Sequence, residues 1–113
     1  MESILLSIKK LLGMSEDYTA FDTDVTMHIN SVFSILRQLG IGPKEGFVIE
    51  DASANWSDFL GDKVTLELVK TYMYMKVKLI FDPPLNASVL QSYKDSIAEF
   101  EWRGNVEAET PET

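Results

Sequence analysis

Side chains that commonly perform chemistry are few in this chain, and they do not fall at the spacings of a catalytic or metal-binding motif. His28 is the single histidine among 113 residues, and cysteine is absent. One chain therefore supplies neither a multi-histidine metal site nor a thiolate that acts as ligand or nucleophile. Because His28 falls within a predicted helix, we interpret it as a neutral, hydrogen-bonded ring that flanks the core.

Carboxylate pairs are the next candidates, and neither available pair fits a site. Asp22 and Asp24 have the spacing that opens a calcium-binding loop, but the glycine and the bidentate glutamate that must follow are missing. We interpret both aspartates as residues that stabilise a helix N-terminus. Glu99 and Glu101 lie two positions apart on a predicted helix, so they cannot face one another for acid–base catalysis.

Hydroxyl groups and glycines offer no better candidate. The serines lack a base partner, and the glycines are scattered at predicted helix ends instead of forming a phosphate-binding loop. We therefore predict no catalytic residue, no metal ligand and no cofactor, and we expect that the protein is not an enzyme.

The charge balance predicts an acidic surface. Ten Lys and Arg residues stand against 18 Asp and Glu, which gives a net charge of −8. Sequence-specific binding to the phosphate backbone needs a basic face, so it is disfavoured here. An acidic surface either serves solubility alone or repels DNA that has to slide past without sticking.

Length and hydropathy predict one domain without a membrane segment. At 113 residues, of which 45% are hydrophobic, the chain can bury a modest core. No apolar run is long enough to span a bilayer. In the opening MESILLSIKKLLGM the lysines follow the apolar residues, an order that a signal peptide does not have. The absence of cysteine is compatible with the cytosol.

The segment from Lys63 to Pro84 is the longest helix-compatible apolar stretch, and we expect the rest of the chain to pack around it. Its apolar side chains form two adjacent stripes. The first comprises Leu66, Val69, Met73, Val77 and Ile80, and the second comprises Leu68, Tyr72, Met75 and Leu79. Together the stripes cover more than half of the helix, which predicts neighbours on two or three sides. Those neighbours belong either to one compact monomer or to adjacent subunits.

Lys76 interrupts this apolar arc, and its position has two interpretations. In the first, the aliphatic stem packs on apolar surface while the ammonium reaches water at an edge. In the second, Lys76 pairs with a carboxylate at a subunit contact. The helix itself should end at Asp82, because the two prolines that follow disfavour its continuation.

Two helices are predicted before this segment. Ser3 to Leu12 forms a short amphipathic helix that docks on the core, because two lysines are few for the alternative of lying on a membrane. Asp22 or Thr23 caps a second helix that runs to about Leu39. Its buried stripe comprises Val25, Ile29, Val32, Leu36 and Leu39.

A final helix is predicted from an Asn86 cap to about Arg103, antiparallel to the central helix. Its inward face comprises Leu90, Tyr93, Ile97 and Phe100. From Gly104 onward the acidic string GNVEAETPET is expected to be disordered.

The middle of the chain, residues 41–62, is predicted to be irregular apart from one helical turn from Trp56 to Leu60. We expect Trp56 and Phe59 to anchor this segment to the core, and the segment either covers the core or contacts a partner. The fold prediction is an all-α bundle of about four helices in a single domain, residues 1–103. A long middle loop and a flexible acidic tail, residues 104–113, complete it.

Several segments, taken in order, resemble the small head–tail connector (adaptor) proteins of tailed bacteriophages, including siphoviruses of Gram-positive hosts. They are the opening SILLSIKKLLGMSEDYTAFDTDVTMHINSVFSILRQLGIGP, then WSDFLGD, YMYMKVKLIFDPP and IAEFEWR. The resemblance extends from Ser3 to about Arg103 and rests on the order of the segments more than on any chemical motif.

The resemblance implies a structural virion protein at the head–tail junction, made in the host cytoplasm. It implies a homo-oligomeric ring, a dodecamer in the virion, that sits beneath the portal protein and extends the DNA channel. DNA would pass through without sequence-specific binding, and the ring would offer a docking surface to the next connector or tail-completion protein. The candidate partner-contact residues are Lys76, Trp56, Phe59, Trp102, Arg103 and Val106.

A second hypothesis comes from a different class of protein. A small cytosolic helical regulator would bind another protein through the wide apolar face of the central helix. It would form a stable dimer and would have no affinity for a portal.

Overall fold

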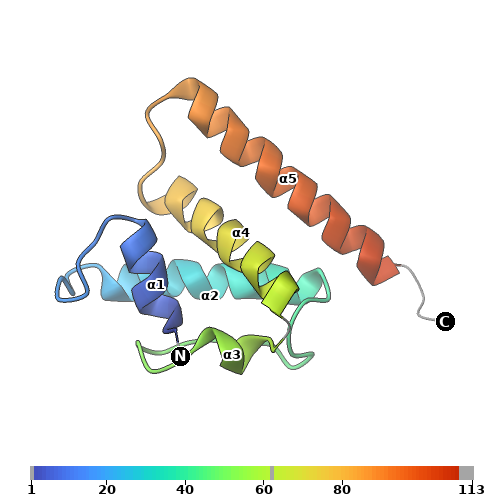
Figure 1. Ribbon diagram of the computed structural model, residues 1–113, viewed down its shortest axis with the longest axis horizontal. Helices are drawn as coiled ribbons and strands as arrows, with labels where there is room; N and C mark the ends of the chain where they lie inside the picture. Colours follow the sequence, from blue (N-terminus) through green and yellow to red (C-terminus); the bar gives the residue numbers. More distant parts are fainter. Residues whose placement is uncertain (1, 62, 110–113) are drawn as a thin grey trace.

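Five α-helices make up the computed structural model, which describes residues 2–61 and 63–109, with backbone alone for Lys63 and residues 104–109. They are α1 (Ile4–Leu11), α2 (Asp22–Gln38), α3 (Trp56–Phe59), α4 (Lys63–Phe81) and α5 (Ala87–Glu109). The described residues form no β-strand, so the predicted all-α class is confirmed. The short α3 is the single helical turn expected within the middle segment (Figure 1).

Helix α1 docks on the bundle through its apolar face, as predicted. Ser3 caps its N-terminus by accepting a hydrogen bond from the Leu6 amide at 3.3 Å. Ile4, Leu5 and Ile8 are buried, and the helix contacts both α2 and α4. Burial of this face within the chain excludes the alternative in which α1 lies on a membrane.

Lys9, at the end of α1, is buried in an ion pair that the sequence did not predict. Its Nζ atom lies 2.8 Å from Oδ1 of Asp22 and donates to the Glu16 carbonyl at 3.1 Å. Asp22 is therefore the first residue of α2 rather than its cap, and the N-cap position is held by Phe21 without a side-chain hydrogen bond. The predicted cap at Asp22 or Thr23 is wrong, because the Asp22 carboxylate binds Lys9 instead.

The core lies where α1, α2 and α4 cross and where the middle segment covers them. All five residues of the predicted α2 stripe are buried, which confirms that face. Phe33 on α2 packs against Phe47 and Phe59, with ring centroids 5.1 and 4.7 Å apart. This aromatic cluster joins the middle segment to the bundle.

The middle segment is held in place by side chains at both of its ends. Asn30 donates to the Ile49 carbonyl at 2.9 Å and accepts from the Ile49 amide at 2.8 Å. Trp56 donates from its indole to the Ser7 hydroxyl at 2.8 Å. Gly42 has a φ of +90°, and a Cβ there would overlap the Phe59 ring. The segment is therefore an ordered cover of the core.

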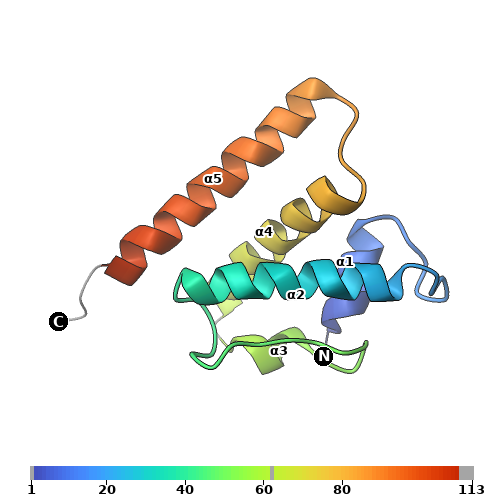
Figure 2. The same cartoon turned by 180° about the vertical axis from the view of Figure 1, so that it is seen from behind.

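Helix α5 forms a long arm that runs antiparallel to α4 and diverges from the bundle (Figures 1 and 2). Asn86 caps it as predicted, accepting from the Ser88 amide at 2.8 Å. The helix continues to Glu109 rather than ending near Arg103, so residues 104–109 have a helical backbone where we expected disorder. Residues 110–113 lie outside the part of the chain that the structure describes.

Candidate interaction surface

The junction of α4 and α5 is built from a few aromatic and charged contacts. Tyr72 stacks on Phe100 with centroids 4.3 Å apart and an interplanar angle of 16°. The Tyr72 hydroxyl also donates to Glu101 at 2.7 Å. Burial, together with this carboxylate, raises the pKa of Tyr72 well above its ordinary value. The phenol therefore remains a hydrogen-bond donor throughout the physiological pH range.

A second polar contact joins the two helices nearer to their connection. The hydroxyl groups of Tyr74 and Tyr93 lie 3.1 Å apart. Burial and this hydrogen bond raise the pKa of Tyr74 to about 12. In this contact one hydroxyl donates its hydrogen to the other.

Lys76 makes an ion pair within its own chain. Its Nζ atom lies 3.4 Å from Oε2 of Glu101, and the two side chains are 24% and 33% exposed. Its carboxylate partner in this structure comes from α5, and a role for Lys76 at a subunit contact stays a prediction. The contact helps to hold the arm on α4.

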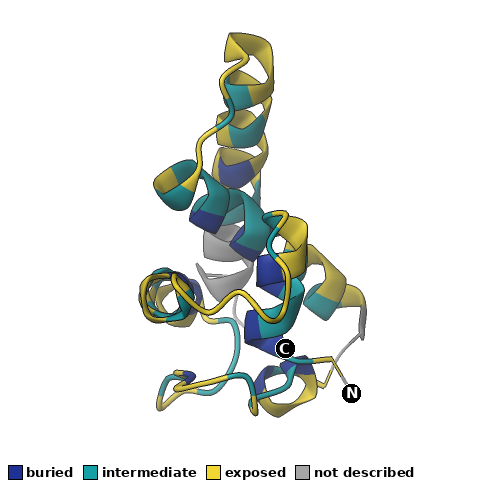
Figure 3. Cartoon of the chain, turned by 90° about the vertical axis from the view of Figure 1, so that its left-hand side faces the viewer, coloured by how far each residue is buried: buried dark blue, intermediate teal, exposed yellow. Residues whose placement is uncertain are grey.

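Helix α5 contributes little to the core. Of its predicted inward face, Ile97 is buried, while Leu90, Tyr93 and Phe100 are half-buried. Figure 3 shows the contrast between this largely exposed arm and the buried interior of the bundle. The predicted face is correct, but the arm covers it only in part.

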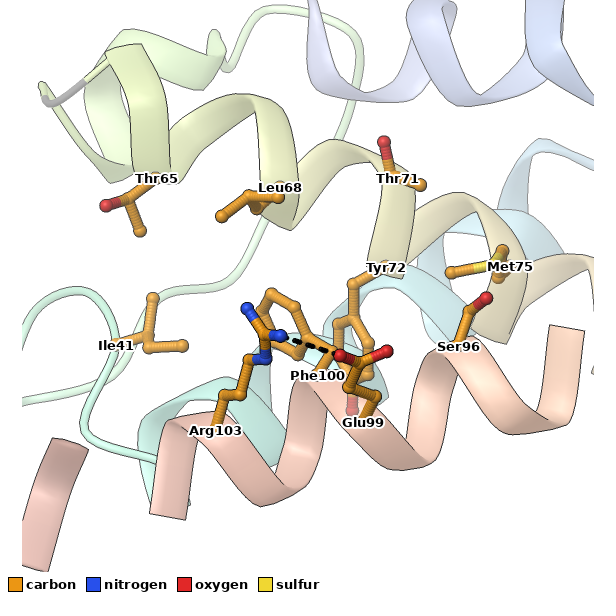
Figure 4. Close-up of a pocket in the computed structure, with 10 residues that line it drawn as sticks. All are labelled: Ile41, Thr65, Leu68, Thr71, Tyr72, Met75, Ser96, Glu99, Phe100 and Arg103. Atoms are coloured by element: carbon orange, nitrogen blue, oxygen red, sulfur yellow. Dashed lines mark hydrogen bonds and ion pairs between the residues drawn. The ribbon is translucent and has the colours of Figure 1, made fainter. Parts of the chain in front are cut away.

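An open groove lies between α4 and α5 and holds a volume of about 390 Å³. We call it the α4–α5 groove, and its main lining residues are Ile41, Leu68, Tyr72, Met75, Phe100 and Arg103. At its rim the Arg103 guanidinium donates to Glu99 at 2.7 Å (Figure 4). The floor of the groove is thus mostly apolar, and its two charged lining residues, Glu99 and Arg103, pair at one edge.

Several large apolar side chains on the same two helices and their connection are exposed. Leu68 is 58% exposed, although it belongs to a stripe that the sequence predicted to need neighbours. Ile80 is 54% exposed, and Leu85 in the connection is fully exposed. Trp102, on α5, is 65% exposed. Of these, Leu68 lines the α4–α5 groove, where it offers apolar surface to a partner.

The candidate contact residues divide between the core and the surface. Trp56 and Phe59 are only 2% and 4% exposed, so the predicted anchoring is confirmed. Both side chains fill the chain's own core, and their assignment as partner contacts stays a prediction. Trp102 and Arg103 are exposed, while the side chain of Val106 lies outside the described part of the structure.

Sequence reasoning missed which parts of α4 stay exposed. The signal was the width of its apolar arc, which exceeds what one small bundle covers. Leu68, assigned to a buried stripe, lies near one edge of that arc, whereas Ile80 shares the angular position of the buried Val69 and Met73 but stands next to the last residue of α4. A helical wheel ranks faces by hydropathy, but it does not say which apolar face the chain leaves open.

A second hollow, of about 370 Å³, lies on another side of α4, and both charged and apolar side chains line it. Glu2, Glu67 and Lys70 line it, and Lys70 forms ion pairs with both glutamates. The Lys70 ammonium also lies 5.9 Å from the centroid of the Trp56 ring. Because Lys70, Glu2 and Glu67 already pair with one another there, we regard this hollow as a poorer docking surface than the α4–α5 groove.

The described residues show no arrangement suited to metal binding. No three acidic or histidine side chains among them come together as ligands. His28 is half-buried, and its ring stands edge-on to Phe81 with centroids 6.5 Å apart. In the same part of the chain, none of the helices has both the length and the apolar character needed to cross a bilayer.

The structure is thus a helical bundle with a long, largely exposed C-terminal helix beside it. Residues 4–111 match the family model described as phage connector protein. The chain therefore belongs to the phage connector protein family and has a structural role in the phage, which confirms the resemblance found in the sequence. Neither a curated protein nor a solved structure matches it.

Proposed function

We propose that this connector assembles as a homo-oligomeric ring, a dodecamer in the virion, beneath the portal at the head–tail junction. There it extends the DNA channel and offers a docking surface to the next connector or tail-completion protein. The observation that carries the proposal is the α4–α5 arm. It leaves large apolar side chains on two helices exposed while contributing little to the core. The role is structural and involves no chemical step.

Ring formation requires each subunit to present two different, complementary surfaces. A head-to-tail contact repeated around an axis closes into a ring, whereas a self-complementary contact stops at a dimer. Helix α5 has its inner flank at the α4–α5 groove and its outer flank in solvent. This supports lateral packing between subunits through the arm.

The charge balance supports passage of DNA without capture. The net charge is −8, and four acidic side chains of the middle segment and α3 are exposed. They are Glu45, Glu50, Asp51 and Asp58. An acidic lining repels the phosphate backbone and so lets DNA slide. We place this segment towards the channel.

The C-terminal end of the chain is the segment that we propose for portal contact. It extends beyond Arg103 at the far end of the arm and includes Val106 and the acidic residues that follow. A helix end that projects from the bundle can add contacts with a partner without disturbing the core.

Deletion of residues 104–113 tests the portal contact. We expect the bundle to keep its melting temperature, because the deleted residues lie beyond the side chains that form the core. Co-sedimentation with purified portal protein should fall at least about tenfold in apparent affinity. Undiminished binding would remove this segment from the docking role.

The full chain provides the broader test. It should co-sediment with the portal from the same phage at moderate salt. A stable dimer without portal affinity would instead favour the cytosolic helical regulator, since the same exposed apolar surface would then pair two copies.

A further inference from the structure

Trp102 is the most exposed of the large aromatic side chains in the described part of the chain, at 65%. It lies on α5 two positions after Phe100, so the two side chains leave the helix about 200° apart. Phe100 lines the α4–α5 groove. Trp102 therefore projects from the opposite side of α5 and cannot enter the groove of its own chain.

The α4–α5 groove has the size and lining to receive an aromatic side chain. Its volume is about 390 Å³, and Leu68, Met75 and Phe100 supply apolar surface. Leu68 remains 58% exposed, so an incoming aromatic side chain would cover apolar surface that the chain itself leaves exposed. Buried Trp side chains in such pockets are typical energetic centres of interfaces.

A charged residue lies beside Trp102, and one of opposite sign lies beside the α4–α5 groove. Asp95 lies seven positions before Trp102, so both occupy the same face of α5, and Asp95 is exposed. Arg103 stands at the rim of the groove, where it already contacts Glu99 at 2.7 Å. A neighbouring copy that inserted Trp102 would bring its Asp95 towards this guanidinium.

We propose that Trp102 of one subunit inserts into the α4–α5 groove of the next subunit, head to tail around the ring. This inference rests on the proposed function and specifies its lateral contact. Trp102 and the α4–α5 groove lie on different flanks of α5. The contact therefore joins two different surfaces and is heterologous. Such a contact propagates from copy to copy and closes only when the ring is complete.

Cross-linking between two single variants tests the geometry directly. The chain has no cysteine, so Ala98→Cys marks the Trp102 face and Thr71→Cys marks the rim of the groove. Neither substitution removes Trp102 or the apolar lining. With a short bismaleimide, the mixture of the two variants should form a cross-linked dimer on the assembled ring, and neither variant alone should do so.

A matched control uses Met27→Cys mixed with Thr71→Cys, because Met27 is 62% exposed on α2 and does not line the groove. This mixture should not cross-link. Efficient cross-linking of Ala98→Cys with itself would overturn the inference, since it would place two outer faces together. Rings that form without the expected cross-link would overturn it as well, while leaving the proposed function standing.

Truncation of the projecting side chain tests the energetics. Trp102→Ala should raise the protein concentration required for half-maximal ring assembly by roughly 30-fold, whereas Leu85→Ala should change it less than about twofold. Both residues are exposed, so both variants should keep the wild-type melting temperature. Equal assembly of the two variants would overturn the inference, and absence of rings and of portal binding in the wild type would overturn the proposed function with it.

Discussion

At the scale of single residues, the Lys9–Asp22 pair illustrates how a buried charge fixes the path of the chain. Lys9 is 1% exposed, and its ammonium joins the end of α1 to the start of α2 and to the Glu16 carbonyl between them. Lys9 and Asp22 are 13 positions apart and belong to different helices, so no spacing along one helix predicts that they pair. The tertiary contact with Asp22 and the Glu16 carbonyl therefore determines the role of Lys9.

Replacing this lysine leaves its carboxylate partner without a cation. Lys9→Met should lower the free energy of unfolding by about 1–3 kcal/mol, because Asp22 loses its charged partner but is itself partly exposed and regains water. Urea denaturation measures the change. The double variant with Asp22→Asn should be more stable than the single variant, and a single variant as stable as the wild type would contradict this role.

Two positions on the same face of α4 differ in burial, because Ile80 lies near the C-terminal end of the helix. Met73 is fully buried, whereas Ile80, assigned to the same stripe by its spacing, is 54% exposed. Met73→Asp should unfold the chain, since an unpaired buried carboxylate costs several kcal/mol. Ile80→Asp should leave a cooperative thermal transition, measured by circular dichroism. A folded Met73→Asp variant would show that the helix faces the other way.

At the scale of elements, the predictable features are those that depend on spacing along one helix. The stripe on α2, the Asn86 cap and the inward face of α5 follow from periodicity and capping chemistry, and the structure confirms each. The end of α5 could not be predicted in the same way, because the acidic residues after Arg103 give little apolar pattern. The exposure of Leu68 could not be predicted either, because α4 has two apolar stripes and the spacing does not say which of them a small bundle buries.

The contact between α4 and α5 should weaken in alkaline solution. The pKa of Tyr74 is raised to about 12 in the folded chain, whereas an unfolded tyrosine titrates near 10. Between about pH 10 and 12 the unfolded state therefore loses protons that the folded state keeps, so stability falls as pH rises. Stability should be independent of this tyrosine below about pH 10.

Urea titrations at two pH values, one below and one above 10, measure this loss. Tyr74→Phe should be less stable than the wild type at the lower pH, because the Tyr93 hydroxyl loses its partner. It should also lose less stability on going to the higher pH. An identical decline in both proteins would contradict the assignment.

At the scale of the whole molecule, the chain is a flat subunit with an arm. Its principal extents are 48, 35 and 20 Å, and α5 lies along one side of the bundle (Figure 2). Helices α1, α2 and α4 contact one another and carry most of the buried core residues, whereas α5 contributes one, Ile97. We therefore interpret the bundle as the folding unit and the arm as the part that serves assembly.

Images of the protein bound to purified portal by negative-stain electron microscopy test this account most directly. We predict a closed annulus of connector subunits stacked coaxially on one face of the portal, with an open central channel. A chain that stays a separate globule beside bare portal particles would contradict the account.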